Sequence, residues 1–299
     1  YILKIAEENN ITKAAEKLFI TQSALNQQLL KLEKELGTPL FHRSRTNWRL
    51  TEAGEIYIEG AKAALQIKNT TYNRIYDVVS ARKGHLTIGL TPGRGLRMFT
   101  SIYPELHRSF PNLDVRPIEM RVRAQQDAIA KGDIDVGLMT LTQKDQTSDT
   151  YYPLKQEELV LIIPSGHPLA AKAAPSGEPL TTLDLTELRY EPFVLMDKTS
   201  TLRSSCDLLF EKAGFAPNIL FETNNTSGIA AMVQSTLCCG IIPRYYTLGL
   251  TEGVACFSLP ERPSWEIVIS CQKNGYLNSG AREFIRLARE YWENSAPLF

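Results

Sequence analysis

The chain contains 299 residues, of which 43% are hydrophobic and 22% charged, and its formal net charge is zero. This length predicts two or three domains, and the composition excludes a disordered chain. The sequence has no apolar run long enough to span a membrane and no basic-then-apolar leader, so we expect a cytoplasmic protein without a membrane partner. Five cysteines without a CxxC spacing argue against a disulfide framework and a structural zinc site, and we expect neither metal nor cofactor.

Charge is distributed unevenly along the chain. Residues 1–83 carry 13 lysines and arginines against 9 acidic residues, a net charge of +4, and the remainder therefore carries −4. A basic N-terminal part on an acidic body suits a polyanion partner at one end only. An ordinary solvated helical surface could carry the same modest excess.

Residues 11–37 predict two short helices joined by a tight turn. Thr12 and Thr21 are candidate N-caps, and each precedes a run of apolar residues at helical spacing. This is the layout of a helix-turn-helix, whose second helix enters the major groove of DNA and presents its first side chains to the bases. Those side chains are all hydrogen-bonding types: Thr21, Gln22, Ser23, Asn26 and Gln27. An ordinary helical hairpin with polar residues in solvent is the alternative.

The next segment, residues 40–51, is basic. Two short strands around residues 44–47 would form a wing whose arginines reach phosphates or the minor groove of double-stranded DNA, namely Arg43, Arg45 and Arg49. A plain basic loop is the alternative. Its place directly after a candidate recognition helix favours the wing, so we assign residues 1–51 to a winged helix-turn-helix DNA-binding domain.

A long helix is predicted from Thr51 to about Arg82, with an apolar stripe along it. A helix of this length, roughly 45 Å, cannot bury its stripe against the small N-terminal domain. A helix from a second subunit is the simple partner, so we interpret residues 52–83 as a linker and dimerisation helix.

From residue 84 onward the pattern is that of an α/β fold. Strands and helices alternate as β-α-β-α-β, which predicts a parallel sheet with helices on both faces, and a second unit of the same kind follows. We therefore predict two lobes, residues 84–163 with 266–299 and residues 164–265, joined by crossing segments near 162–164 and 262–266.

Lobed α/β sheets bind ligands at the carboxyl ends of their strands. The candidate binding residues there favour a polar or anionic small molecule, and they are Thr91, Arg94, Thr140, Thr199, Ser200, Thr201 and Asn225. Arg97 and Arg203 could add charge, although these two and Arg94 could equally be surface arginines. The three hydroxyls at 199–201 are the best single signal, and simple helix capping explains them equally well.

Signatures of enzymes are missing from the sequence, which holds no GxSxG, GxGxxG, GxxxxGK[ST] or HExxH and therefore no candidate catalytic residues. A solute-binding or transport-associated protein with a helical dimerisation head is the alternative function. A redox-sensing pair, Cys206 with Cys238 or Cys239, is a further hypothesis, although such cysteines are usually small buried hydrophobes.

Over nearly its full length the chain resembles the LysR-type transcriptional regulators. The resemblance rests on TKAAEKLFITQSALNQQLLKLEKELGTPLFHR, RLTEAG, LTIGL, ELVLIIPSGHPLA and GIIPR, in the order of that family. It implies a winged helix-turn-helix, a dimerising linker helix and a two-lobed effector domain similar to periplasmic binding proteins. It also implies homodimers or homotetramers on promoter DNA that respond to a small-molecule effector.

The resemblance assigns roles to several residues already singled out. Base-facing positions match Gln22, Ser23, Asn26 and Gln27, basic wing positions match Arg43 and Arg49, and effector contacts map onto the Thr91 turn, the 199–201 turn and the Asn225 region. The chain also departs from the family, which usually has Ser and Arg at positions 26 and 27, Arg or Lys at position 30 and Gly at position 45. The recognition helix is thus less basic than is usual, and the wing is expected to supply more of the phosphate contacts.

Overall fold

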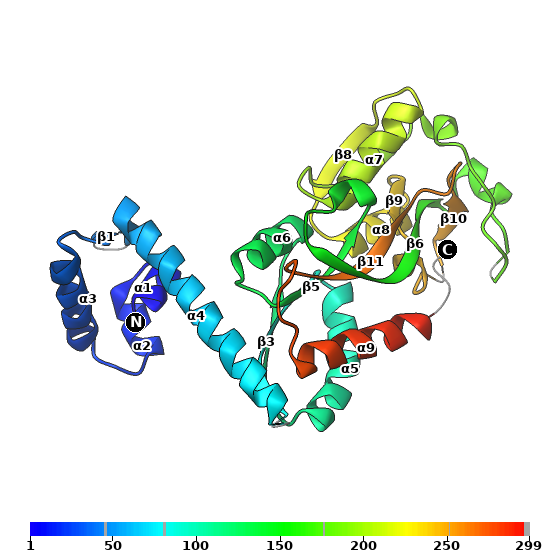
Figure 1. The fold of residues 1–299 in the computed structure, drawn as a ribbon. Coiled ribbons are helices and arrows are strands. Elements are labelled where there is room, and N and C mark those ends of the chain that lie inside the picture. Colours follow the sequence, from blue (N-terminus) through cyan, green and yellow to red (C-terminus); the bar gives the residue numbers. More distant parts are fainter. Residues whose placement is uncertain (45–46, 80–81, 176, 251, 296–299) are drawn as a thin grey trace.

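The computed structural model describes residues 1–44, 47–79, 82–175, 177–250 and 252–295. It shows a small helical head, a long helix and a larger α/β body, with the head at the start of the long helix and the body following its end (Figure 1). No helix within these described residues is long and apolar enough to cross a membrane.

The head consists of three helices and a two-stranded wing. Its elements are α1 (Ile2–Glu8), α2 (Ile11–Lys17), α3 (Gln22–Leu36), β1 (Phe41–His42) and β2 (Arg49–Leu50), and the two strands pair antiparallel. They enclose one apolar core, whose most buried members include Ile5, Ala14, Leu25, Leu29 and Leu40. The predicted helix-turn-helix and wing are therefore both present.

The sequence predicted the N-cap of α3 correctly and that of α2 incorrectly. The side chain of Thr21 accepts the N–H of Ala24, as predicted for the start of α3. Thr12 is not the cap of α2, because the side chain of Asn10 accepts the N–H groups of Thr12 and Lys13. Asparagine is as good an N-cap as threonine, and it lies one residue before the first helical turn.

Helix α4 (Glu52–Val78) connects the head to the body and ends four residues before the predicted Arg82. Much of its apolar stripe lies in solvent, and Ile56, Ile67 and Val78 are 68%, 69% and 85% exposed. The end of α4 is fixed to the body by Asp77, which accepts hydrogen bonds from Tyr276 and Ser279 and pairs with Arg282. Most of the apolar stripe of α4 is thus exposed to solvent, whereas the C-terminal end of the helix is bonded to the body.

The first lobe is built on a mixed sheet, which contains the parallel strands that the sequence predicted. Three strands are parallel, β4 (Asn112–Glu119), β3 (Lys83–Leu90) and β5 (Val136–Leu141). Strand β11 (Ser264–Cys271) runs antiparallel between β5 and β6 (Thr150–Pro164), because the chain returns from the second lobe in the opposite direction. Helices α5 (Arg94–Ser109) and α9 (Ser279–Glu293) cover one face, and α6 (Val122–Lys131) covers the other.

The second lobe holds a parallel pair of strands and an antiparallel group. The pair is β7 (Pro192–Met196) with β8 (Asn218–Thr223), and the far half of β6 pairs antiparallel with β9 (Gly240–Pro243) and β10 (Val254–Ser258). Helices α7 (Thr201–Lys212) and α8 (Thr226–Gln234) complete it. Sequence reasoning missed β10 and four short 3-10 turns, Gln143–Asp145, Pro168–Lys172, Leu185–Leu188 and Arg244–Thr247.

Strand β6 crosses from one lobe to the other within its length. Its residues up to Glu158 pair with β11, whereas residues 159–163 pair with β9 and β10 and lie in the cores of the second lobe. The crossing therefore lies at 158–159, earlier than the predicted 162–164, and the return crossing at 263–264 falls within the predicted segment. A continuous apolar run gives no sign of where a strand changes lobes, which is why the sequence placed this crossing late.

Candidate functional sites

The first turn of α3 presents polar side chains to solvent. Gln22, Ser23 and Gln27 are exposed and Asn26 is half-buried. The hydroxyl of Thr12 donates to Oε1 of Gln22 at 3.2 Å, and this bond does not occupy the amide N–H₂ of the exposed Gln22 side chain. The predicted base-facing residues thus lie together on the surface of one helix.

The wing arginines differ in how they are held. Arg43 forms an ion pair with Glu33 of α3, a side chain that is only 8% exposed, and its guanidinium carbon lies 5.6 Å from the centre of the Trp48 ring. Arg43 therefore ties the wing to α3, a role that sequence reasoning missed. Arg49 is exposed on β2, and Arg45 lies outside the described residues.

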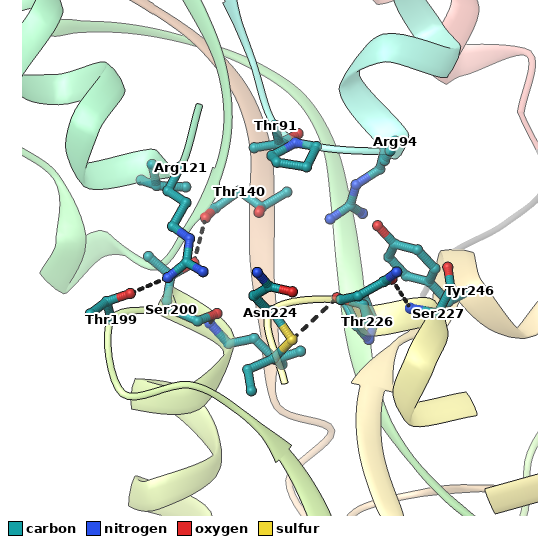
Figure 2. A pocket seen from close by; sticks show the side chains of 18 of the residues that line it. Thr91, Arg94, Arg121, Thr140, Thr199, Ser200, Asn224, Thr226, Ser227 and Tyr246 are labelled. Carbon is teal, nitrogen blue, oxygen red and sulfur yellow. Dashed lines mark hydrogen bonds between the residues drawn. The ribbon is translucent and has the colours of Figure 1, made fainter. Parts of the chain in front are cut away.

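A cavity of about 530 Å³ lies between the two lobes (Figure 2). All seven candidate effector residues line it, namely Thr91, Arg94, Thr140, Thr199, Ser200, Thr201 and Asn225. Sequence reasoning did not single out several further lining residues, among them Arg121, Val122, Met196, Ser227, Tyr246 and Trp265. The expectation that ligands bind at the carboxyl ends of the strands thus located the cavity and about half of the polar residues that line it.

Several of the predicted hydroxyl and amide groups already have partners within the fold. The side chain of Ser200 accepts the N–H of Leu202, and that of Asn225 accepts the N–H of Ser227, so both residues cap helices. The Thr201 hydroxyl is buried and donates to the carbonyl of Thr140 at 3.3 Å. Capping therefore explains Ser200 and Asn225, whereas Thr201 joins the two lobes.

Arg94 is not a surface arginine, which corrects one of the alternatives from the sequence. Its side chain is 5% exposed and forms an ion pair with Glu157, whose side chain is fully buried. Glu157 also accepts the indole N–H of Trp265 at 2.7 Å and the backbone N–H of Tyr245 at 2.9 Å. The rings of Tyr245, Tyr246 and Trp265 lie 5.5 to 5.9 Å from the guanidinium, and Figure 2 shows it beside Tyr246 at the cavity wall.

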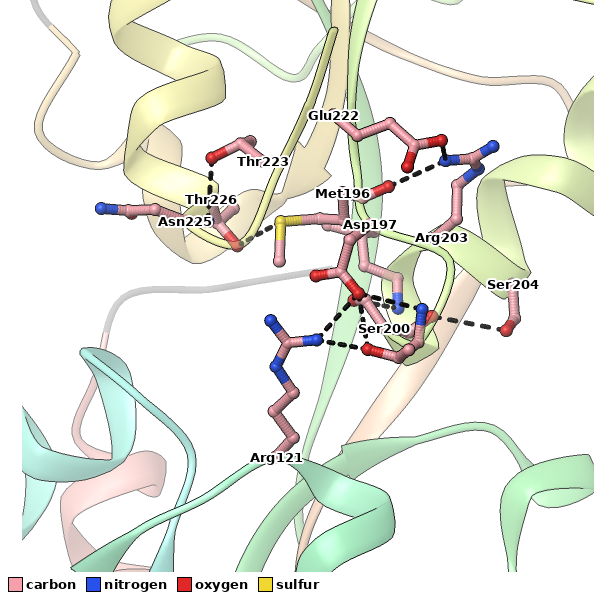
Figure 3. A network of polar contacts seen from close by, with 12 residues as sticks. Arg121, Met196, Asp197, Ser200, Arg203, Ser204, Glu222, Thr223, Asn225 and Thr226 are labelled. Atoms are coloured by element: carbon pink, nitrogen blue, oxygen red, sulfur yellow. Dashed lines mark hydrogen bonds and ion pairs between the residues drawn. The ribbon is translucent and has the colours of Figure 1, made fainter. Parts of the chain in front are cut away.

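The other two arginines considered from the sequence do not line the cavity. Arg97 is exposed on α5. Arg203 is buried and donates to Asp207 at 2.7 Å, to Glu222 at 2.6 Å and to the carbonyl of Met196 at 3.0 Å (Figure 3). Arg203 therefore holds α7 against β7 and β8 and adds no charge to the cavity.

Arg121 is the charged residue that sequence reasoning missed. It directly precedes α6, and its Nη1 reaches across the cavity to Oδ1 of Asp197 at 2.8 Å and to the hydroxyl of Thr199 (Figures 2 and 3). Burial raises the pKa of Asp197, but hydrogen bonds from Thr199 and Arg121 outweigh it and hold this pKa below its ordinary value. Arg121 follows the carboxyl end of β4 as Thr91 follows that of β3. The same expectation about strand ends could therefore have identified Arg121 from the sequence.

The cysteines give no support to a redox pair. Cys206, Cys238 and Cys239 are buried free thiols. Burial raises the pKa of Cys206 and of Cys239 to about 12 in each case, so both stay protonated and poorly nucleophilic near neutral pH. In the part of the chain that the structure describes, no group of three or more His, Cys, Asp or Glu side chains could hold a metal ion.

Comparisons with known proteins match both parts of the chain. Residues 1–55 match the family model of the bacterial regulatory helix-turn-helix protein, lysR family, and residues 80–293 match the LysR substrate binding domain. The uncharacterised HTH-type transcriptional regulator YcgK of Bacillus subtilis is 28% identical over 302 residues, covering 97% of this chain and 92% of YcgK.

Solved structures share the fold. A full-length variant of OxyR from Pseudomonas aeruginosa has a TM-score of 0.67 at 22% identity, over 98% of this chain and 93% of OxyR. The effector binding domain of QuiR, in complex with shikimate, has a TM-score of 0.59 at 18% identity, over 71% of this chain and 98% of that domain. The predicted two-lobed fold of the effector domain is thus confirmed, together with the helix-turn-helix fold of the head.

Proposed function

Because this chain belongs to the LysR family of transcriptional regulators, we propose that it reads promoter DNA with α3 and the wing and senses a small polar or anionic molecule between its lobes. The observation that carries the second half is the cavity of about 530 Å³ in which strand ends of both lobes meet. The alternative of a solute-binding protein with a dimerisation head does not account for the match of residues 1–55 to a DNA-binding domain.

The DNA-reading proposal rests on the exposed amides and hydroxyls of α3 and on the basic wing. Gln and Asn pair bidentately with adenine, and arginines contact phosphates. Predicted base contacts are Thr21, Gln22, Ser23, Asn26 and Gln27, and predicted phosphate contacts are Arg43, Arg45 and Arg49. Since Arg43 is paired with Glu33, we expect Arg49 to contribute more of the phosphate affinity than Arg43 does.

A gel-shift experiment with the DNA upstream of the protein's own gene tests this proposal. Binding should weaken steeply with salt, and Gln22→Ala should cost about 1–3 kcal/mol of discrimination between specific and random duplexes. The control is Gln28→Ala, an exposed residue on the same helix outside the proposed contact set. If Gln22→Ala and Gln28→Ala discriminate equally well, the base-contact role of Gln22 is wrong.

The effector proposal is supported by the size and the lining of the cavity. Its volume falls within the usual range for small-molecule sites, roughly 300–1,000 Å³, and it combines hydroxyls with Tyr246 and Trp265. QuiR shows that a domain of this fold accommodates a small hydroxylated acid. A thermal-shift screen of small carboxylates and aromatic acids tests the proposal, with Thr91→Val as the cavity variant and Thr100→Val on α5 as the control. Ligands that bind both variants as they bind the wild type would place the site elsewhere.

Self-association through α4 is the third part of the proposal. It is supported by the apolar side chains of α4 that lie in solvent, among them Ile56, Ile67 and Val78. Substituting Ile67→Glu should convert the oligomer, a homodimer or homotetramer, to smaller species in sedimentation velocity. Glu59→Gln on the same helix is the control, and an unchanged distribution for Ile67→Glu would exclude this interface.

A further inference from the structure

The cavity holds two arginines that bind carboxylates in different ways. Arg94 is enclosed by aromatic rings and paired with Glu157, which has no solvent exposure. Arg121 lies at the opposite side and is 44% exposed, and its partner Asp197 is 26% exposed. Of the two pairs, the second joins side chains of different lobes, and Figure 3 shows this contact.

When the pair of Arg121 and Asp197 separates, Asp197 keeps other donors at Oδ1, while its Oδ2 is buried and has no hydrogen bond within the described residues. Oδ1 of Asp197 accepts two further hydrogen bonds from within its own loop, from the Thr199 N–H at 3.0 Å and the Thr199 hydroxyl at 2.5 Å. It keeps these when Arg121 leaves. The guanidinium is already partly hydrated, and ion pairs of this exposure contribute little net stability. Separation of Arg94 from Glu157, by contrast, would leave the carboxylate of Glu157 without a counter-charge and without access to solvent.

The surroundings of Arg121 also favour an anion. Arg121 is the N-cap residue of α6, a helix of 10 residues, and no side chain of the described chain caps it, nor does its first turn hold an acidic residue. The N-termini of α7 and α8 are capped by Ser200 and Asn225. An anion at Arg121 would therefore also meet free N–H groups at the positive end of the α6 dipole.

We propose that Arg121 determines effector specificity by exchanging carboxylates. In the ligand-free protein it holds Asp197, and a carboxylate on the effector takes the place of Asp197 on the guanidinium. The exchange conserves the number of ion pairs at Arg121, so it favours a carboxylate over a neutral analogue of the same shape. This inference rests on the proposed function, because it requires the cavity between the lobes to be the effector site.

The test compares matched acids and amides on the full-length protein by isothermal titration calorimetry. The probes are shikimate and benzoate, each beside its own carboxamide. We expect the wild type to prefer the acids and Arg121→Gln to lose about tenfold in affinity for them, with the amides unaffected, because a charge-assisted hydrogen bond is lost. The control is Arg123→Gln, which removes the same charge from an exposed position on α6 outside the cavity lining.

The exchange predicts an opposite effect for the displaced partner. Asp197→Asn keeps the shape of the side chain and removes the competing charge, so it should raise the affinity for the acids several-fold. Thr199→Val removes one acceptor of Arg121 and keeps Asp197, so it should raise the affinity for the acids by less. This variant replaces Asp197→Asn if that protein folds poorly. The control for the charge change is Asp127→Asn on the exposed side of α6.

Three outcomes would overturn the inference, and one of them separates it from the proposed function. If acids and amides bind the wild type equally, the cavity is an effector site but Arg121 does not select carboxylates. If Asp197→Asn and Thr199→Val weaken acid binding, Asp197 positions the effector and is not displaced by it. If neither acids nor amides bind at all, the effector site as proposed is wrong as well.

Discussion

The two arginine–carboxylate pairs of the cavity share their chemistry and differ in their surroundings. Arg94 and Glu157 are 5% and 0% exposed, and Glu157 has further donors in Trp265 and Tyr245. Arg121 and Asp197 are 44% and 26% exposed and belong to different lobes. The first pair lies where β6 and β11 cross between the lobes, and in the second pair Arg121 lines the cavity.

This difference shows that burial decides whether such a pair is structural or exchangeable. Removing one partner of a buried pair leaves the other charge uncompensated in a medium of low polarity, whereas an exposed pair is replaced by water at little cost. We therefore regard Arg94 as a structural residue of the joint between the lobes, by which we mean the crossing segments of β6 and β11. Arg121 is the arginine that is available to a ligand. Four variants test this comparison.

The largest effect is expected from Arg94→Ala. It leaves Glu157 buried without its counter-charge, so the free energy of unfolding should fall by about 3–5 kcal/mol. Urea unfolding followed by circular dichroism measures this, and Arg97→Ala, exposed on the same helix α5, is the control with an expected change near zero. Equal stabilities of the two variants would show that the buried pair does not stabilise the joint.

A smaller loss is expected from Trp265→Phe, which keeps an aromatic ring beside Arg94 and removes the indole N–H that donates to Glu157. Leaving this acceptor one donor short should cost about 1–3 kcal/mol of unfolding free energy. Because both residues act on the same carboxylate, the double variant Arg94→Ala with Trp265→Phe should cost less than the two single losses together. Strict additivity in urea unfolding would show that Trp265 acts independently of the pair.

Arg121→Ala should have little effect on stability, with a change of about 1 kcal/mol or less, because the pair with Asp197 is partly exposed. The same urea titration measures it, and Arg123→Ala is the matched control. A loss as large as that of Arg94→Ala would make Arg121 a structural residue and remove the contrast between the two pairs.

The smallest effect is expected from the pH dependence of Asp197. Burial raises its pKa, but hydrogen bonds from Thr199 and Arg121 lower it by more, so the folded pKa lies below that of the unfolded chain, about 3.9. A depressed pKa contributes stability above the unfolded value, and this is lost as the pH falls through the folded value. The stability difference between the wild type and Asp197→Asn should therefore stay constant from neutral pH to about pH 4 and shrink below it.

Unfolding free energies measured across this pH range, with Asp127→Asn as the control, check this expectation. A difference between wild type and Asp197→Asn that grows on acidification would mean that the carboxyl group is stabilised in its protonated form. Arg121 would then not hold a carboxylate in the ligand-free protein.

Local sequence patterns were enough to predict the position of many helices and strands. Helical spacing located α2 and α3, and of the two predicted N-caps only Thr21 of α3 is correct. Apolar runs bounded by turns located most strands of the body, because a buried strand must be apolar on both faces. The antiparallel return of β11 and the change of lobe within β6 have no local signature, since both depend on which strand each segment pairs with.

The cavity shows the same division. Its seven predicted residues all line it because the carboxyl ends of neighbouring strands meet at one edge of a sheet, which is a property of chain order. The sequence determined the family, the helix-turn-helix and the place of the cavity. Only the tertiary structure decided that Arg94 is buried beside Glu157, 63 positions away, and that Arg121 reaches Asp197 at a separation of 76. The fate of a charged side chain depends on the solvent and the partners that surround it, and only the folded chain brings these together.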